Sequence, residues 1–154
     1  MMKVIERKAS DNKYLHRDFH ISMNLLMQYI CDEFGAGALT EYLVQFSKAF
    51  HSQRTENMKT DGLECLRKYF TEIYEKEEWP VSIVMGNDVL TISQDACPGI
   101  TYLEKNGHKP VAQYIETYTM VYKTMCEGTP YEYIMENFTA QTGACRQRFQ
   151  RRQS

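Results

Sequence analysis

The chain has 154 residues, which is enough for one domain with a buried core, and 43% of them are hydrophobic. Its net charge of −2 gives no overall basic field for nucleic acid, and no apolar run reaches the roughly 20 residues that cross a bilayer. Five scattered cysteines without a Cys-x-x-Cys pair, and a charged N-terminus without an apolar stretch, argue against a secreted disulfide framework. We therefore expect one cytoplasmic domain over residues 1–154, with a loosely held lead-in at residues 1–10.

Three helices are predicted in the N-terminal half, because apolar residues recur there at intervals of three and four. A Gly-Ala-Gly segment ends the first helix, so the second folds back on it as an antiparallel partner. The third helix stops before Pro80, and the acids in its last turns are interpreted as a solvated face. The helices cover residues 11–34, 38–54 and 61–78, with a polar loop at residues 52–60. The apolar face of the first helix holds Leu15, Phe19, Met23, Leu26, Ile30 and Phe34.

The hydrophobic period changes from helical to alternating after Pro80, which predicts two β-hairpins. A helix from Pro110 to Cys126 lies between them, since proline is tolerated at a first helical position. Two hairpins separated by a helix can form one sheet. We therefore predict an α+β fold of order ααα-ββ-α-ββ, with helices packed on a four-stranded antiparallel sheet. The predicted strands are residues 81–85, 89–94, 131–138 and 144–150, with a three-residue hairpin loop at 86–88.

The last predicted strand alternates between two kinds of side chain. Because successive side chains of a strand point to opposite faces, Cys145, Gln147 and Phe149 share one face and the arginines between them share the other. The four arginines at 146, 148, 151 and 152 are interpreted as part of a charged, frayed final strand rather than as a phosphate site.

The segment 95–110 is predicted to be a loop that joins the first hairpin to the following helix. It contains Cys97-Pro98-Gly99. The thiol is followed by a proline, which has no backbone N–H, and then by a glycine, which is conformationally flexible. Cys97 follows one strand and Cys145 begins another, so both can lie at one edge of the sheet. A thiol is nucleophilic only as the thiolate, and His108 can supply a base. We predict Cys97, His108 and Cys145 as catalytic residues; alternatively, each cysteine is a small buried hydrophobic residue.

Three tyrosines recur every four residues on the helix that follows this loop. Each offers an apolar ring and a hydroxyl, which suits the wall of an amphipathic ligand pocket, and Tyr133 on the next strand extends the set. The alternative is that these rings belong to the core or to an interface. The predicted ligand-binding residues are Tyr114, Tyr118, Tyr122, Tyr133 and His20.

His16 and His20 are four residues apart on the first helix, a spacing that can place two imidazoles on one metal ion. They equally fit two polar residues beside the apolar face, where Asn24, Met27 and Cys31 continue the same stripe. No closed zinc spacing, phosphate-binding glycine loop or Gly-x-Ser-x-Gly elbow is present in the sequence. The sequence therefore assigns no metal ligand and leaves the cofactor unknown.

Two short motifs stand out from Val89 onward: Cys97-Pro98 after a strand, and Thr142-Gly143-Ala144-Cys145-Arg146-Gln147-Arg148-Phe149. With the helix between them, they resemble the L-2-amino-thiazoline-4-carboxylic acid hydrolase family. The Gly-x-Cys-x-x-x-Phe ending is also similar to 4-vinyl-reductase-type small-molecule-binding domains, which share helices packed on a four-stranded antiparallel sheet. Tyr114 stands where the resemblance would place a further cysteine, which argues against a cysteine-based metal site.

The resemblance implies a hydrolase that opens a C–N or C–S bond in a small heterocycle or amide. Cys97 would be its nucleophile or a metal ligand, His108 or His20 its base, and Cys145 a neighbour lining the site. The alternative is a non-catalytic small-molecule-binding or sensing domain, in which the tyrosines and the sheet enclose an apolar pocket. Either protein would bind a small molecule, with no nucleic-acid or membrane partner, and exposed aromatic helix faces would allow a homodimer. A solvent-open cleft would favour the enzyme, and an enclosed apolar cavity the binding domain.

Overall fold

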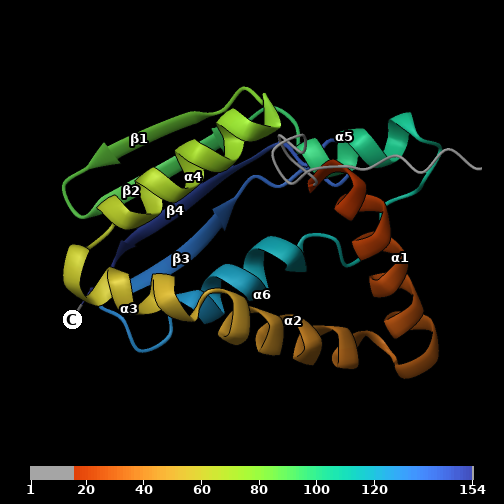
Figure 1. The fold of residues 1–154 in the computed structure, drawn as a ribbon, viewed down its shortest axis with the longest axis horizontal. Helices are drawn as coiled ribbons and strands as arrows, with labels where there is room; N and C mark the ends of the chain where they lie inside the picture. Colours follow the sequence, from red (N-terminus) through yellow and green to blue (C-terminus); the bar gives the residue numbers. More distant parts are fainter. Residues whose placement is uncertain (1–15, 154) are drawn as a thin grey trace, which may run out of the picture.

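A computed structural model describes residues 16–153, and the predicted start of the first helix at residue 11 lies outside them. The described part contains six helices and one four-stranded antiparallel sheet, which confirms the predicted α+β class (Figure 1). In chain order the elements are α1 (His16–Phe34), α2 (Ala36–Phe50), α3 (Ser52–Asp61), α4 (Glu64–Glu77), β1 (Ser82–Gly86), β2 (Val89–Gln94), α5 (Pro98–Lys105), α6 (Glu116–Met125), β3 (Tyr131–Glu136) and β4 (Cys145–Arg151).

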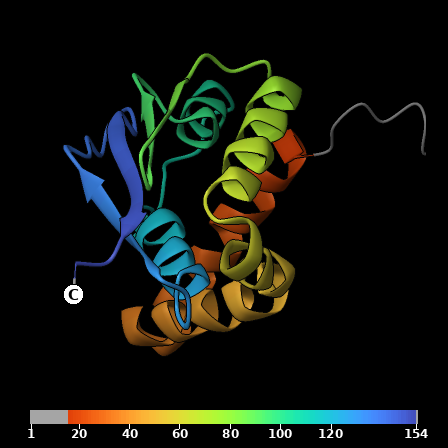
Figure 2. The ribbon, with the colours of Figure 1, turned by 90° about the vertical axis from the view of Figure 1, so that its left-hand side faces the viewer.

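The sheet has the strand order β1-β2-β4-β3, and every neighbouring pair is antiparallel. Figure 2 shows the helices gathered on one side of this sheet. Cys145, Gln147 and Phe149 are buried, whereas Arg148 pairs with Glu136 at 2.8 Å, so the predicted alternation along the last strand is confirmed. Because β4 lies between β2 and β3, the prediction of a frayed final strand is wrong.

The face of α1 that contacts the core is rotated from the predicted one. Asn24 and Met27 are buried, and of the predicted face Met23 and Ile30 pack against the core. The side-chain amide of Asn24 donates to the carbonyl of Lys109 and accepts from the N–H of Val111, at 2.9 Å each. One side chain of α1 therefore satisfies two backbone groups of the segment before α6. Exposed residues of the predicted face are Phe19 (47%), Leu26 (40%) and Phe34 (69%).

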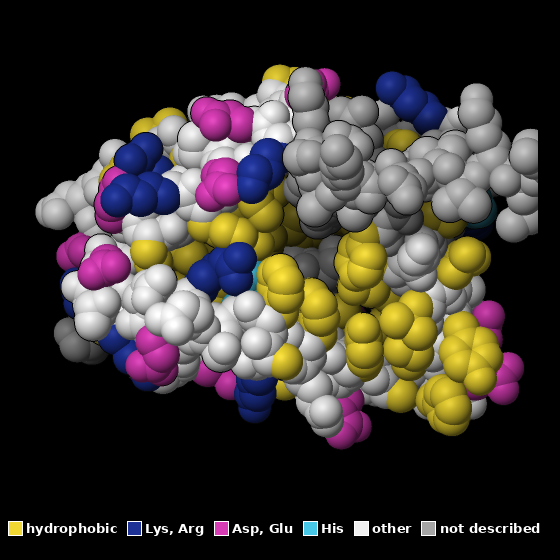
Figure 3. Space-filling view, viewed as in Figure 1, with side chains coloured by type: hydrophobic (Ala, Val, Ile, Leu, Met, Phe, Trp, Pro, Cys, Tyr) yellow, Lys and Arg dark blue, Asp and Glu magenta, His cyan; other side chains and the backbone are white. Residues whose placement is uncertain are grey.

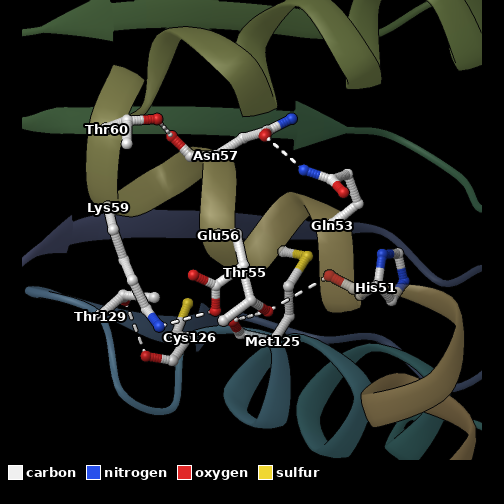
Figure 4. Close-up of polar contacts among 10 residues, drawn as sticks. All are labelled: His51, Gln53, Thr55, Glu56, Asn57, Lys59, Thr60, Met125, Cys126 and Thr129. Carbon is white, nitrogen blue, oxygen red and sulfur yellow. Dashed lines mark hydrogen bonds and ion pairs between the residues drawn. The ribbon is translucent and has the colours of Figure 1, made fainter.

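The segment predicted as a loop at residues 52–60 is a helix, α3, and α2 ends at Phe50. Met58 is the buried residue of α3, so its sequence lacks the apolar stripe from which helices are predicted. The Thr55 hydroxyl donates to the carbonyl of Met125 on α6 at 2.8 Å, which attaches α3 to the helix beneath it (Figure 4).

The predicted loop at residues 95–110 contains a further helix, α5. Cys97 is its N-cap in an extended conformation, and Pro98 occupies the first turn, where a missing N–H costs nothing. The helix predicted from Pro110 begins later, at Glu116, after a series of turns. The first hairpin loop has two residues rather than three, because Gly86 pairs with Val89.

Candidate functional site

A cavity of about 600 Å³ lies between two hydrophobic clusters. One cluster fills the space between the sheet and α4, and the other packs α1 and α2 against α6. Aliphatic and aromatic side chains make up most of the cavity wall, and Figure 3 shows hydrophobic side chains around a hollow in the molecular face. The apolar walls include Met27, Leu43, Phe70, Ile73 and Val121.

Four of the residues predicted from the sequence meet at one end of this cavity. The Cys97 Sγ atom lies 2.8 Å from the hydroxyl of Tyr118 and 4.0 Å from that of Tyr114. His20 and Tyr114 both pack against Gly99, where an added Cβ would come 3.0 Å from His20 Nδ1 and would overlap the Tyr114 hydroxyl. The glycine therefore lets an imidazole, a phenol and the turn that carries the thiol approach one another.

Glu77 joins this polar end of the cavity from the last turn of α4. Its carboxylate lies 3.3 Å from His20 Nε2, and the two side chains are 4% and 11% exposed. A carboxylate this deeply buried requires a polar or cationic partner, and the His20 imidazole supplies one. The interpretation of the α4 acids as a solvated face is therefore wrong for Glu77, although Glu72, Glu75 and Glu78 are exposed.

The two motifs that carry the family resemblance are in contact with each other. The backbone N–H of Cys97 donates to the carbonyl of Thr142 at 2.7 Å, and Gly143 lies directly against the Cys97 side chain. On the other side of the turn, the indole N–H of Trp79 donates to the carbonyl of Ala96 at 2.9 Å. The Cys97 turn is thus held by the segment that follows α4 and by the β3–β4 loop together.

Gln94, the last residue of β2, links the sheet to the thiol. Its side-chain NH₂ donates to the carbonyl of Gly143 at 2.9 Å and to the Tyr118 hydroxyl at 3.4 Å. Its carbonyl oxygen accepts from the hydroxyl of Tyr74 at 3.1 Å. Tyr74, Gln94, Tyr118 and Cys97 therefore form one buried hydrogen-bonded chain along the cavity wall.

The thiol and the two phenols at the polar end of the cavity are neutral donors rather than an activated nucleophile. Burial raises the pKa of the Cys97 thiol, and the Tyr118 hydroxyl and the N–H groups of Ile100 and Gly99 oppose this effect only in part. Burial, followed by the neighbouring Cys97, raises the pKa of Tyr114 and of Tyr118 as well. At neutral pH the thiol and both phenols can each donate a hydrogen bond to a ligand, whereas nucleophilic attack needs a thiolate.

The other predicted residues at this end of the sheet do not line the cavity. His108 follows the C-terminal end of α5, and the eight residues of that helix separate it from Cys97 by about 12 Å. Cys145 faces Gln94 across the β2–β4 pair, and burial, followed by the nearby Cys97, raises its pKa to about 11. The predicted base that lies in the cavity is therefore His20.

The sequence-predicted tyrosines divide between the cavity and the core. Tyr114, Tyr118 and Tyr122 line the cavity, and the ring of Tyr122 lies 5.4 Å from that of Phe70. Tyr133 points into the core instead, where its hydroxyl donates to the side chain of Gln147 at 2.8 Å. Tyr133 therefore does not line the cavity. The side chain of His16 lies outside the described residues.

Three polar residues of this region were missed by the sequence analysis: His51, Glu77 and Gln94. Gln94 lies on the same face of β2 as the buried residues Leu90 and Ile92, because side chains of a strand alternate between its two faces. The alternating pattern could therefore have predicted that Gln94 is buried. His51 lies at the α2–α3 junction, inside a segment predicted as one continuous helix, and Glu77 lies in a run of acids. No local pattern distinguishes these two, because packing of distant helices brings them to the cavity.

Within residues 16–153, no group of three or more histidine, cysteine or acidic side chains is arranged to hold a metal ion. None of the described helices combines the length and the apolar character needed to cross a membrane. No protein-family model matches the chain, and no curated protein sequence matches it significantly.

Proposed function

We propose that the protein binds a small, mainly apolar molecule in the cavity between its two hydrophobic clusters. The observation that carries this proposal is the cavity of about 600 Å³, because ligand pockets commonly have volumes of roughly 300–1,000 Å³. Apolar walls supply most of the binding energy, in proportion to the surface that the ligand removes from water. Cys97, Tyr114 and Tyr118 add neutral polar groups at one end of the cavity.

An apolar ligand is expected to raise the melting temperature, because a compound at about 100 times its dissociation constant adds about 2.7 kcal/mol to the free energy of unfolding. A thermal-shift series of medium-chain alcohols, carboxylic acids and aromatic amines tests this. Thr117→Phe should abolish the shift, since Thr117 lines the cavity and the larger ring would fill it.

Thr119→Phe is the matched control for this experiment. Thr117 and Thr119 are both half-buried on α6, and each hydroxyl donates to a carbonyl of the preceding turn, but Thr119 does not line the cavity. The control variant should therefore respond to ligands like the unmodified protein. A series without any hit, or an equal shift in both variants, would contradict binding in this cavity.

A hydrolase is the second candidate, favoured by the presence of a thiol and a His20–Glu77 pair in one cavity. If Cys97 is the nucleophile, Cys97→Ala should abolish turnover of L-2-amino-thiazoline-4-carboxylic acid and leave the melting temperature within a few degrees. Cys65→Ala, at a half-buried thiol outside the cavity, should keep full activity. Unchanged turnover in Cys97→Ala, or no turnover by the unmodified protein, would argue against this candidate.

We also propose a cytoplasmic location and a homodimer, each from one observation. All five cysteines lie in the described part of the chain and are free thiols, as a reducing compartment favours. Exposed apolar side chains on α1, among them Leu25 (56%) and Tyr29 (57%), offer a surface for a second copy.

A further inference from the structure

His51 is a buried residue whose Nδ1 atom has no hydrogen-bond partner among residues 16–153, and it lines the cavity at the end away from Cys97. It lies at the junction of α2 and α3 and is 3% exposed. Its Nδ1 atom is covered from solvent, and no hydrogen bond joins its side chain to any residue from 16 to 153. Figure 4 shows that its backbone carbonyl accepts from Thr55 while the ring projects away from these contacts. Buried polar groups in folded proteins are paired in the great majority of cases, so this one calls for a partner.

Three rings surround the imidazole and form this end of the cavity. The centroids of Phe50, Tyr69 and Tyr122 lie 5.0, 6.0 and 6.1 Å from that of His51, all in edge-to-face orientation. Burial, followed by the nearby Arg54 charge, lowers the pKa of His51 to about 4. The imidazole is therefore neutral near pH 7 and presents one N–H and one acceptor nitrogen in an otherwise apolar setting.

Arg54 places a positive charge beside two of these rings, although Arg54 itself is not one of the residues that line the cavity. Its guanidinium carbon lies 3.7 Å from the ring centroid of Tyr69 and 5.1 Å from that of Phe50, and both rings line the cavity. One guanidinium N–H group donates to the carbonyl of Phe50 at 3.2 Å. No carboxylate in the described portion of the chain forms an ion pair with this guanidinium, whose remaining donors can serve a ligand.

The opposite end of the cavity contains the buried carboxylate of Glu77, which is already paired with His20. Tyr69 and Glu77 both belong to α4 and are eight positions apart, which separates the two ends by about 12 Å. Arg54 forms no ion pair with a carboxylate of residues 16–153, so its charge favours a ligand anion at the His51 end. The cavity is thus polarised along its length.

We propose that the ligand is an apolar monocarboxylic acid whose carboxylate lies beside His51 and Arg54 and whose hydrocarbon part extends toward Cys97. This assignment rests on the binding function proposed above and adds the chemical class and the orientation of the ligand. The His51 N–H and the Arg54 guanidinium would donate to the carboxylate oxygens, as buried carboxylates require. The apolar part would contact Phe70 and Val121.

Calorimetric titration with decanoate and with 1-decanol near neutral pH tests the assignment, because the two probes share a chain and differ in the charged group. We expect decanoate to bind at least about tenfold more tightly than 1-decanol. Arg54→Gln should remove this preference by weakening decanoate alone. Lys59→Gln removes a cation of the same helix that is paired with Glu56 rather than placed over the Phe50 and Tyr69 rings, and it should leave the preference intact.

His51→Gln is the second variant and should weaken decanoate about tenfold while leaving 1-decanol within about twofold. If this buried substitution prevents folding, the half-buried Arg54 variant decides the question by itself. Equal affinity of the unmodified protein for the two probes would overturn the acid assignment and leave the binding function standing. Absence of binding by both probes would overturn the acid assignment and count against the binding function as well.

Discussion

Replacing Gly143 with alanine is expected to lower the free energy of unfolding by about 2–4 kcal/mol. The φ angle of Gly143 is 71°, which L-residues other than glycine rarely adopt, and an added Cβ would lie under 3.0 Å from the Cβ of Cys97. Cys97 has little room to yield, because its N–H is bonded to the carbonyl of Thr142 at 2.7 Å. Urea denaturation of the two proteins measures the difference.

Gly128→Ala separates the two causes of this loss. Gly128 has nearly the same φ angle, 72°, but nothing lies within 4 Å of the position of its Cβ. This control should lose only the backbone contribution, about 1–2 kcal/mol. If both variants lose the same amount, the close packing of the β3–β4 loop against the Cys97 turn contributes nothing to stability.

Acidification is expected to destabilise the protein through His51 by about 3 kcal/mol. Burial, followed by the Arg54 charge, lowers the pKa of this side chain from 6.5 to about 4 in the folded protein. Between these two values the unfolded chain binds more protons than the folded one, so the free energy of unfolding rises with pH. Above pH 6.5 the neutral His51 causes no loss of stability. The free energy of unfolding then falls progressively as the pH is lowered from 6.5 toward 4.

The His51→Gln variant isolates this effect from the other groups that titrate in acid. Its own stability at neutral pH is irrelevant, since the measured quantity is the difference between the two proteins as a function of pH. As the pH falls from 6.5 to about 4, the unmodified protein should lose about 3 kcal/mol of unfolding free energy relative to the variant. Urea titrations at constant ionic strength measure this change. A difference that does not change with pH would show that His51 titrates alike in the folded and unfolded chains.

The strands could be predicted closely because alternation is a local signal, whereas two helices could not. Pro98 and Gly99 are typical of turns, but the proline occupies the first turn of α5 and the glycine gives room to Tyr114 and His20. α3 has a polar sequence with one buried residue, Met58, so its helical state depends on attachment to α6 rather than on its own pattern. Contacts between distant segments decide both cases.

The polar end of the cavity was partly predictable for a similar reason. A spacing of four puts Tyr114 and Tyr118 on one side of the predicted helix, and Cys97 stands out as a thiol in a turn. In the structure Tyr114 lies in the turns before α6 and still lines the cavity. His108 has an equally plausible place in the sequence, yet α5 carries it away from the thiol. Glu77 is one of several neighbouring acids, and only the packing of α1 against α4 singles it out as the partner of His20.

Trp79 provides the protein with an optical reporter at its candidate site. It is the one tryptophan of the chain, it follows the end of α4 that carries Glu77, and its indole N–H is bonded to the residue before Cys97. Indole emission depends on the polarity and hydrogen bonding of its surroundings. Movement of the Cys97 turn, whether caused by a ligand or by a substitution, should therefore appear as a change in tryptophan fluorescence without any added label.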